Sequence, residues 1–452
     1  MLMDKIKIDE INNYLLYYLN KQILKEDKIK SSINKIINKL NICNPTTQRH
    51  KYLSLSCIFG AFLGDSIGAN TEFCEPSHNN HLLIFKNING RFIPGEITDD
   101  SEMAMSAAFA YMDAKNENDP RIQSLIFYYF CIWGYSSPKD MGNTTAKSLL
   151  FWDTRLNIEQ TNYNNKIKQI IQKENLNSLA NGFLMRISTF IVFYYYTRYE
   201  KIHNIIQNYF NYSINNLELT KDLLNLFMDI YNEVVKNTEI THPNLETAIS
   251  AAIFSLLVLV GMVRNNAQDI YSLFKIIVKS KIFIESCSDS IYKKQAQINQ
   301  KIYANIIYEI EKNKKIDVYN SMGYYIHAFK LSLYYLYKYP KMGKNNDQNL
   351  YYNIMCEICD LGGDTDTNCA IVGTMIGPLI GYKNFKKELF DKFIKFYPEK
   401  RTQYTSAFMY IYVNYLEEKY FYKINHYEHK HEEIYKYPSF VKLLEFLNDK
   451  IE

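Results

Sequence analysis

Glycine and proline are scarce in this sequence, with 16 glycines and 10 prolines among 452 residues. Sandwiches and barrels built from many short strands use both residues often in their turns, whereas long helices need few of them. The chain also lacks an internal repeat, an alternating strand pattern and the glycine patterns of Walker and Rossmann nucleotide sites. We therefore predict an all-α fold, a compact single domain of many helices with extensions at both termini.

An excess of charge and a long membrane-spanning run are absent as well. The chain has 52 basic and 48 acidic residues, and the basic residues are scattered, which does not indicate a nucleic-acid surface. The N-terminus alternates charged and apolar residues and shows no signal-peptide core. The longest uncharged apolar runs, 248–263 and 369–382, fall short of the roughly 20 residues of a membrane span. We expect an intracellular, cytoplasmic monomer that binds neither nucleic acid nor membrane.

The eight cysteines are dispersed and include one Cys-x-x-Cys pair, Cys356 and Cys359. A zinc site would need a second such pair, or histidines at matching spacing, and neither is visible. We interpret the pair as structural, with its thiols reduced.

The most distinctive segment is 361–368, where Asp364, Thr365, Asp366 and Thr367 follow two glycines and precede an apolar run. Side chains at i and i+2 do not share a helix face, so the two carboxylates can converge only in a loop or an irregular first turn. The glycine pair permits such a turn. The segment is therefore a candidate ligand site at a helix start.

A second oxygen-rich cluster, 98–102, contains Thr98, Asp99 and Asp100 and also leads into an apolar stretch. Two carboxylates about 4 Å apart repel by roughly 4 kcal/mol at an effective dielectric of 20, so a gathered group needs protons or cations. Carboxylate and hydroxyl oxygens without His or Cys favour Mg²⁺, Mn²⁺ or Ca²⁺ over zinc. We predict that the two clusters are halves of one metal site.

A simpler interpretation exists for each feature alone. Either acidic cluster could be only a capped helix start. Asp65, inside an apolar helix, is costly unless hydrogen-bonded or near a cation, so it is either a cap or a support for the site. His242 precedes a proline and should project from a loop at a helix start, where a lone histidine is usually structural.

Small residues mark two apolar helices as tightly packed. Gly60, Gly64 and Gly68 lie in the segment 52–69, and glycines recur at four-residue intervals at 373, 377 and 381. Both patterns favour close approach of a neighbouring helix.

Taken in order, the motifs resemble those of the ADP-ribosylglycohydrolase family, which includes ADP-ribosylhydrolases and dinitrogenase-reductase-activating glycohydrolases. The resemblance covers about residues 52 to 385 by motif comparison. The segments that carry it are 64–68 with Glu72, 98–100, 140–145, 181–186, 241–243, 323–329 and 362–367.

The resemblance implies a compact all-α fold with a central dinuclear site for Mg²⁺ or Mn²⁺. The implied metal ligands are Thr98, Asp99, Asp100, Asp364, Asp366 and Thr367. The implied catalytic residues are Glu72, as the mobile-loop glutamate that engages metals and water, with Asp99 and Asp366. The implied substrate-binding residues are Asp140 on the distal ribose, a phosphate loop that acts through backbone amides (Asn181, Gly182, Phe183, Leu184, Met185), and His242. Phe183 departs from the small residue of many members, which predicts a reshaped phosphate or ribose contact.

The predicted function is metal-dependent hydrolysis that releases ADP-ribose from an ADP-ribosylated protein or related conjugate. The alternatives are a non-catalytic ADP-ribose or nucleotide binder, a crystallin-like structural relative, and a metal phosphohydrolase that would release AMP. The predicted division is a helical N-terminal extension (1–50), a catalytic domain (51–385) and a helical C-terminal extension (386–452).

Overall fold

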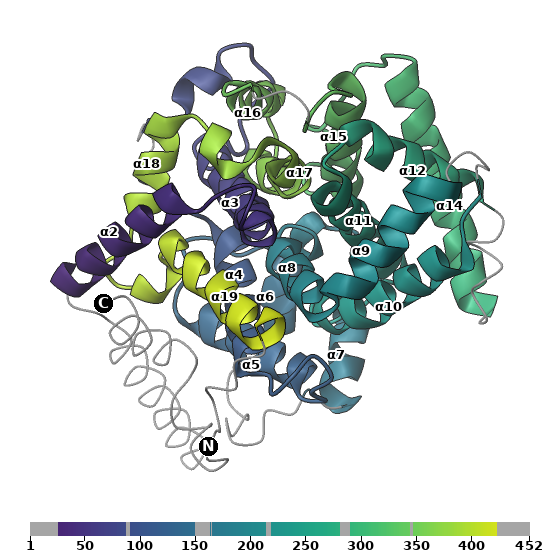
Figure 1. Ribbon diagram of the computed structural model, residues 1–452, viewed down its shortest axis with the longest axis horizontal. Coiled ribbons are helices and arrows are strands. Elements are labelled where there is room, and N and C mark those ends of the chain that lie inside the picture. The colour runs from purple at the N-terminus through teal and green to yellow at the C-terminus, as the bar shows by residue number, and fades with distance from the viewer. Residues whose placement is uncertain are drawn as a thin grey trace.

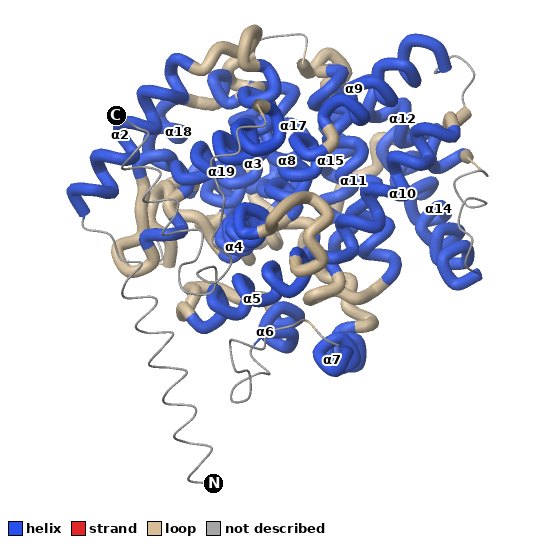
Figure 2. Tube along the Cα trace, turned by 60° about the horizontal axis from the view of Figure 1, so that its bottom comes forward, coloured by secondary structure: helices blue, strands red, loops and turns tan. Residues whose placement is uncertain are grey.

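The computed structural model describes residues 26–86, 91–149, 163, 165–213, 218–280, 290–343 and 347–422. Figure 2 shows helices joined by loops, and these ranges contain no strand; Ala180 and Tyr324 form an isolated antiparallel bridge. The prediction of an all-α fold is confirmed.

Two buried helices, α3 (Arg49–Gly68) and α17 (Thr365–Ile380), lie side by side and antiparallel in the interior of the molecule (Figure 1). Their backbones touch, because a Cβ added to Gly60 would lie 2.4 Å from the carbonyl oxygen of Gly373. A Cβ on Gly68 would lie 2.5 Å from the Cα of Asp366. Only glycine permits this approach, and it brings the end of α3 onto the beginning of α17. The predicted close packing is confirmed for both helices.

The other helices surround this pair. Helices α4, α11, α15 and α16 pack on α17, while α8, α19 and α4 pack on α3. Their bounds are α4 Asp99–Asp113, α5 Ile122–Tyr135, α6 Asn143–Leu149, α7 Asn165–Asn175, α8 Ile187–Thr197, α9 Tyr199–Asn208, α10 Lys221–Thr238, α11 Leu245–Arg264, α12 Ala267–Lys279, α14 Ser290–Glu311, α15 Tyr325–Lys338, α16 Leu350–Leu361, α18 Lys387–Lys395 and α19 Met409–Leu416. Single turns are η1 Asn80–Leu83, η4 Asn181–Phe183, η5 Tyr209–Ser213, η7 Tyr382–Asn384, η8 Thr402–Tyr404, η9 Ser406–Phe408 and η10 Glu417–Phe421.

Helix α11 has no charged residue between Glu246 in its first turn and Arg264 at its end, and it lies in the core. It begins after Asn244, whose side chain accepts from the amide of Glu246, and ends at Asn265 in the left-handed conformation. Among the described residues it is the one helix long and apolar enough to cross a membrane, but its apolar window is entirely buried in the protein. It is a core helix, as predicted.

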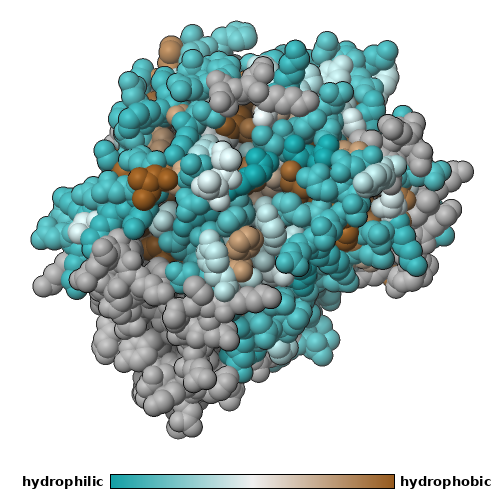
Figure 3. All heavy atoms as spheres, viewed as in Figure 1, coloured by the Kyte–Doolittle hydropathy of each residue, from teal (hydrophilic) through white to brown (hydrophobic). Residues whose placement is uncertain are grey.

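The described part of the N-terminal extension belongs to the same core. Helix α2 (Glu26–Ile42) buries Ile29, Ile33, Ile36 and Leu40, which recur at helical spacing, and it packs on α18 and η9. The segments 1–25 and 423–452 of the two extensions lie outside the described residues, and the domain division stays a prediction. On the face drawn in Figure 3, hydrophobic side chains form small separate groups within a mainly hydrophilic surface.

Candidate metal centre

Three helix ends meet at the middle of the molecule and bring five carboxylates together. Oxygens of Asp65 on α3, Asp100 on α4 and Asp366 on α17 lie within 4.8 Å of one another, and all three residues are buried. Oxygens of Glu72, Asp364 and Asp366 meet the same limit. Asp366 belongs to both groups, so they form one continuous feature, which we call the carboxylate cluster.

The glycine pair before α17 makes the irregular helix start that the sequence predicts. Gly362 and Gly363 have φ values of +70° and +75°, and Asp364 occupies the N-cap position. The amide of Gly363 donates to the carbonyl of Cys74 at 2.9 Å, and Gly363 accepts from the amide of Phe73 at 2.7 Å. The turn thereby holds the loop that carries Glu72 against the beginning of α17.

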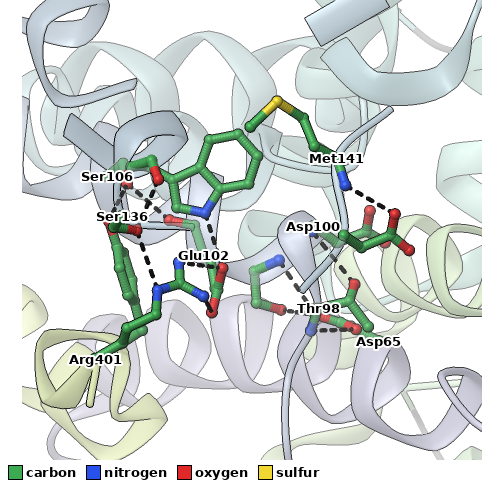
Figure 4. Close-up of polar contacts among 12 residues, drawn as sticks. Asp65, Thr98, Asp100, Glu102, Ser106, Ser136, Met141 and Arg401 are labelled. Carbon is green, nitrogen blue, oxygen red and sulfur yellow. Dashed lines mark hydrogen bonds and ion pairs between the residues drawn. The ribbon is translucent and has the colours of Figure 1, made fainter. Parts of the chain in front are cut away.

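Asp65 caps the beginning of α4. Its carboxylate accepts from the amide of Thr98 at 3.1 Å, from the amide of Ser101 at 3.2 Å and from the hydroxyl of Ser101 at 2.5 Å. Figure 4 shows Asp65 beside Thr98. Both interpretations of Asp65 therefore hold, since it caps a helix while one of its oxygens lies among the cluster carboxylates.

The two acidic segments of the sequence are joined through Asp100. The Thr367 hydroxyl donates to its Oδ1 at 3.1 Å, and the Thr98 hydroxyl accepts from its amide at 3.4 Å. The other oxygen, Oδ2, is buried without a hydrogen-bond partner among the described residues. A buried carboxylate oxygen in that position calls for a proton or a cation.

Burial controls the electrostatics of the cluster. It raises the pKa of Asp100 and of Asp366 well above the ordinary value, and neighbouring carboxylates add to both shifts. Burial also raises the pKa of Asp65 to about 7 despite its hydrogen bonds. Burial raises the pKa of Glu72 to about 8, an effect that Arg91 opposes and Asp140 reinforces.

These residues fit divalent metal ions. The donor set is carboxylate and hydroxyl oxygen, the kind that hard cations bind. A bound cation would satisfy Oδ2 of Asp100 and would favour the ionised form of every raised carboxyl group.

Glu102, the last member of the second acidic segment, turns away from the cluster. Arg401 donates to its two oxygens at 2.8 and 2.7 Å, and the indole of Trp133 donates at 2.8 Å (Figure 4). Glu102 thus anchors α4 to the segment that follows α18.

Asp99 and Asp140 lie beside the cluster and are not members of it. Burial raises the pKa of Asp99 well above the ordinary value, and Asp140 contributes next. Asp140 accepts from the amide of Met141 at 2.8 Å. The catalytic and ligand roles implied for Asp99 stay predictions.

Arg91 is a site residue that sequence reasoning missed. Its guanidinium donates to Glu72 at 2.6 Å and also to Asp140, so it joins a member of the cluster to the residue expected at the distal ribose. The side chain is 37% exposed and stacks over Phe73 and Phe92. A single arginine outside any motif carries no sequence signal of this position.

The turn η4 begins the expected phosphate loop and is hydrogen-bonded to the cluster. The side-chain amide of Asn181 donates to Oδ2 of Asp364 at 2.7 Å, and the backbone carbonyl of Asn181 accepts from the amides of Leu184 and Met185. Phe183, Leu184 and Met185 are buried, so their side chains belong to the core. Gly182 is the one residue of the segment 181–185 that is partly exposed.

His242 lies against this turn, as expected for a residue of the same site. A Cβ on Gly182 would lie 3.0 Å from its Cε1 atom. The ring of Phe183 packs between His242 and Tyr325, with centroids 5.5 and 5.6 Å away. The bulk of Phe183 thus supports the imidazole from within the core.

These features define a class of helical protein. Its members have a buried cluster of carboxylates, without His or Cys, beside a turn that contains glycine. The family model of the ADP-ribosylglycohydrolases matches residues 45–406, so the chain belongs to the ADP-ribosylglycohydrolase family. Membership supports a glycohydrolase function.

The chain is also similar to individual proteins. A protein of Acanthamoeba polyphaga mimivirus that is named as an ADP-ribosyl glycohydrolase is 24% identical over 339 residues, which cover 72% of this chain and 86% of that protein. A solved structure titled "ADP-ribosylglycohydrolase-related protein complex" is 13% identical with a TM-score of 0.44, and the match covers 76% of this chain and 97% of that one.

Proposed function

We propose that this family member is a metal-dependent hydrolase that releases ADP-ribose from ADP-ribosylated protein side chains or from related ADP-ribose conjugates. The observation that carries the proposal is the carboxylate cluster around Asp366, linked by Asn181 to the turn at Gly182. The proposed cofactors are two divalent cations, Mg²⁺ or Mn²⁺, because the donors are oxygen atoms only.

The residues that would hold the cations surround Asp366. Asp100 and Asp364 each have an oxygen within 4.8 Å of an oxygen of Asp366, and the remaining proposed ligands are Thr98, Asp99 and Thr367. When bound, divalent cations orient the sugar hydroxyls and lower the pKa of adjacent water.

Glu72 is the proposed proton acceptor. It lies at the edge of the cluster on a loop, with a side chain only 7% exposed. Water adds to the anomeric carbon of the distal ribose while the bond to the leaving nitrogen or oxygen breaks, and Glu72 takes the water proton and passes it to the leaving group. General base catalysis of this kind contributes about 10² to 10⁴ in rate.

The substrate side rests on the turn and the residues around it. Asp140 would contact the distal ribose, and Asn181, Gly182 and His242 would meet the diphosphate and its ribose. The group that carries ADP-ribose is recognised by the shape of the surrounding loops. A panel of ADP-ribose conjugates is therefore needed to identify the linkage that is cut.

The test is hydrolysis of a panel comprising ADP-ribosyl-arginine peptide, ADP-ribosyl-serine peptide, poly-ADP-ribose and O-acetyl-ADP-ribose, each with and without a chelator. Mass spectrometry identifies the product. Release of ADP-ribose that the chelator abolishes supports the proposal. AMP as product would instead indicate a phosphohydrolase, and tight binding of ADP-ribose without turnover of any substrate would indicate a binding protein.

A further inference from the structure

Arg186 is a fully buried cation that lies directly behind the turn at Gly182. Its guanidinium donates to the Gly182 carbonyl at 2.8 Å, to Oδ1 and the carbonyl of Asn237 at 3.0 and 3.1 Å, and to the Thr241 hydroxyl at 2.8 Å. It also stacks over the ring of Phe130, at 4.8 Å from the centroid. All of these acceptors are neutral, so the positive charge has no carboxylate among them.

The Thr241 hydroxyl connects Arg186 to His242 through hydrogen bonds. The Thr241 hydroxyl lies 2.8 Å from Nδ1 of the imidazole. Arginine can only donate, so Thr241 accepts from Arg186. Its one hydrogen then goes to Nδ1 of His242, the remaining neighbour of this hydroxyl among the described residues. Nδ1 is therefore an acceptor, and the proton of the neutral ring resides on Nε2.

Nε2 of His242 has no partner among the described residues, although the side chain is only 1% exposed. Nε2 lies 3.5 Å from the position that a Cβ on Gly182 would take. The neighbouring residue in this turn, Asn181, is hydrogen-bonded to Asp364. A buried N–H without an acceptor is costly, and a ligand oxygen beside Gly182 would satisfy it. Burial, followed by the charge of Arg186, lowers the pKa of His242 well below the ordinary value, which keeps the ring neutral.

We propose that Arg186 and Thr241 are positioning residues that hold His242 as the Nε2–H tautomer, so that it donates a hydrogen bond to a phosphate oxygen of ADP-ribose beside Gly182. The inference rests on the proposed function, because it takes ADP-ribose as the ligand. The unmatched charge of Arg186 behind the turn adds a preference for an anion at this point.

Thr241→Val tests the relay, because it removes the hydroxyl and keeps the shape. In the full chain with ¹⁵N-labelled histidine, the His242 signals are assigned by their loss in His242→Gln. We expect the unchanged chain to carry its proton on Nε2. In Thr241→Val, we expect loss of this fixed tautomer and about tenfold weaker binding of ADP-ribose in calorimetry with Mg²⁺.

Two further variants separate the relay from a general packing defect. Thr241→Ser keeps the hydroxyl and should restore both the tautomer and the affinity. Thr189→Val is the matched control, since Thr189 is equally buried and donates to the Ala104 carbonyl at 2.8 Å. It should change neither readout.

The failures are distinguishable. An Nδ1–H tautomer in the unchanged chain overturns the relay, and so does Thr241→Val with the affinity of the unchanged chain. If the unchanged chain neither binds nor releases ADP-ribose, the proposed function is wrong. ADP-ribose is then also wrong as the ligand of His242, whichever tautomer is found.

Discussion

Asp366→Asn should change the stability of the protein in opposite directions with and without metal. Asp366 lies within 4.8 Å of the carboxylates of both groups in the cluster. Two unit charges at that separation interact by about 3.5 kcal/mol at an effective dielectric of 20. In the metal-free protein, Asp366 must either keep its charge against this repulsion or take up a proton, and asparagine removes that cost. In the metal-bound protein, asparagine removes an attraction to the cation. Asparagine keeps the acceptor for the Thr367 amide, which Oδ1 of Asp366 binds at 2.9 Å.

The assay is thermal unfolding followed by circular dichroism near neutral pH. In chelator, Asp366→Asn should unfold at a higher temperature than the unchanged chain, with a gain of about 2 kcal/mol or more. In Mg²⁺ the order should reverse, because the unchanged chain gains binding free energy that the variant loses.

Asp119→Asn is the matched control. Asp119 is also buried, but Arg121 and two backbone amides hold the pKa of its carboxyl at about 2 against the effect of burial. Its loss should destabilise the protein equally in chelator and in Mg²⁺. The reasoning is refuted if Asp366→Asn is destabilised in both conditions by the same amount, as a simple helix-capping role requires.

Three other outcomes follow from the same geometry. Because the pKa of Asp65 is raised to about 7 and that of Glu72 to about 8, the folded chain binds protons that the unfolded chain has lost above about pH 4. Stability in chelator should therefore fall by about 1.4 kcal/mol per pH unit per group up to about pH 7, and denaturant titrations with Mg²⁺ should show a much smaller slope. Arg91→Gln removes a cation bound to Glu72 at 2.6 Å and should tighten Mg²⁺ binding severalfold in calorimetry, whereas unchanged affinity would show that Arg91 does not compete with the metal. Gly182→Ala places a Cβ 3.0 Å from Cε1 of His242 and should weaken ADP-ribose binding about tenfold while the stabilisation by Mg²⁺ stays as it was; equal affinity would place the ligand elsewhere.

Local patterns predicted much of the fold and the centre of the site. Scarce turn residues indicated helices, and the glycine pair before Asp364 indicated the irregular turn that the structure contains. Spaced glycines indicated tight helix packing, although not that the helices around Gly60 and Gly373 are partners. These features depend on neighbours in the sequence, so they can be read without the fold.

The residues that sequence reasoning missed act across long separations. Arg91 and Arg401 are isolated arginines whose carboxylate partners come from other segments, Glu72 and Asp140 for the first and Glu102 for the second. Arg186 belongs to a recognised motif, but its bond to Thr241 depends on how the fold brings the residue before α8 to the segment that follows α10. Nothing in the spacing of these residues indicates their partners, because tertiary packing alone creates the contacts.

The most direct test of the account is metal-dependent release of ADP-ribose by Asp364→Asn and Asp99→Asn, each shown by circular dichroism to be folded. Asp364 is a cluster member that accepts from Asn181 at 2.7 Å, and Asp99 lies beside the cluster. The account predicts that the unchanged chain releases ADP-ribose from at least one conjugate of the panel only with Mg²⁺ or Mn²⁺, and that both variants lose this release. Full metal-dependent release by either folded variant would contradict it.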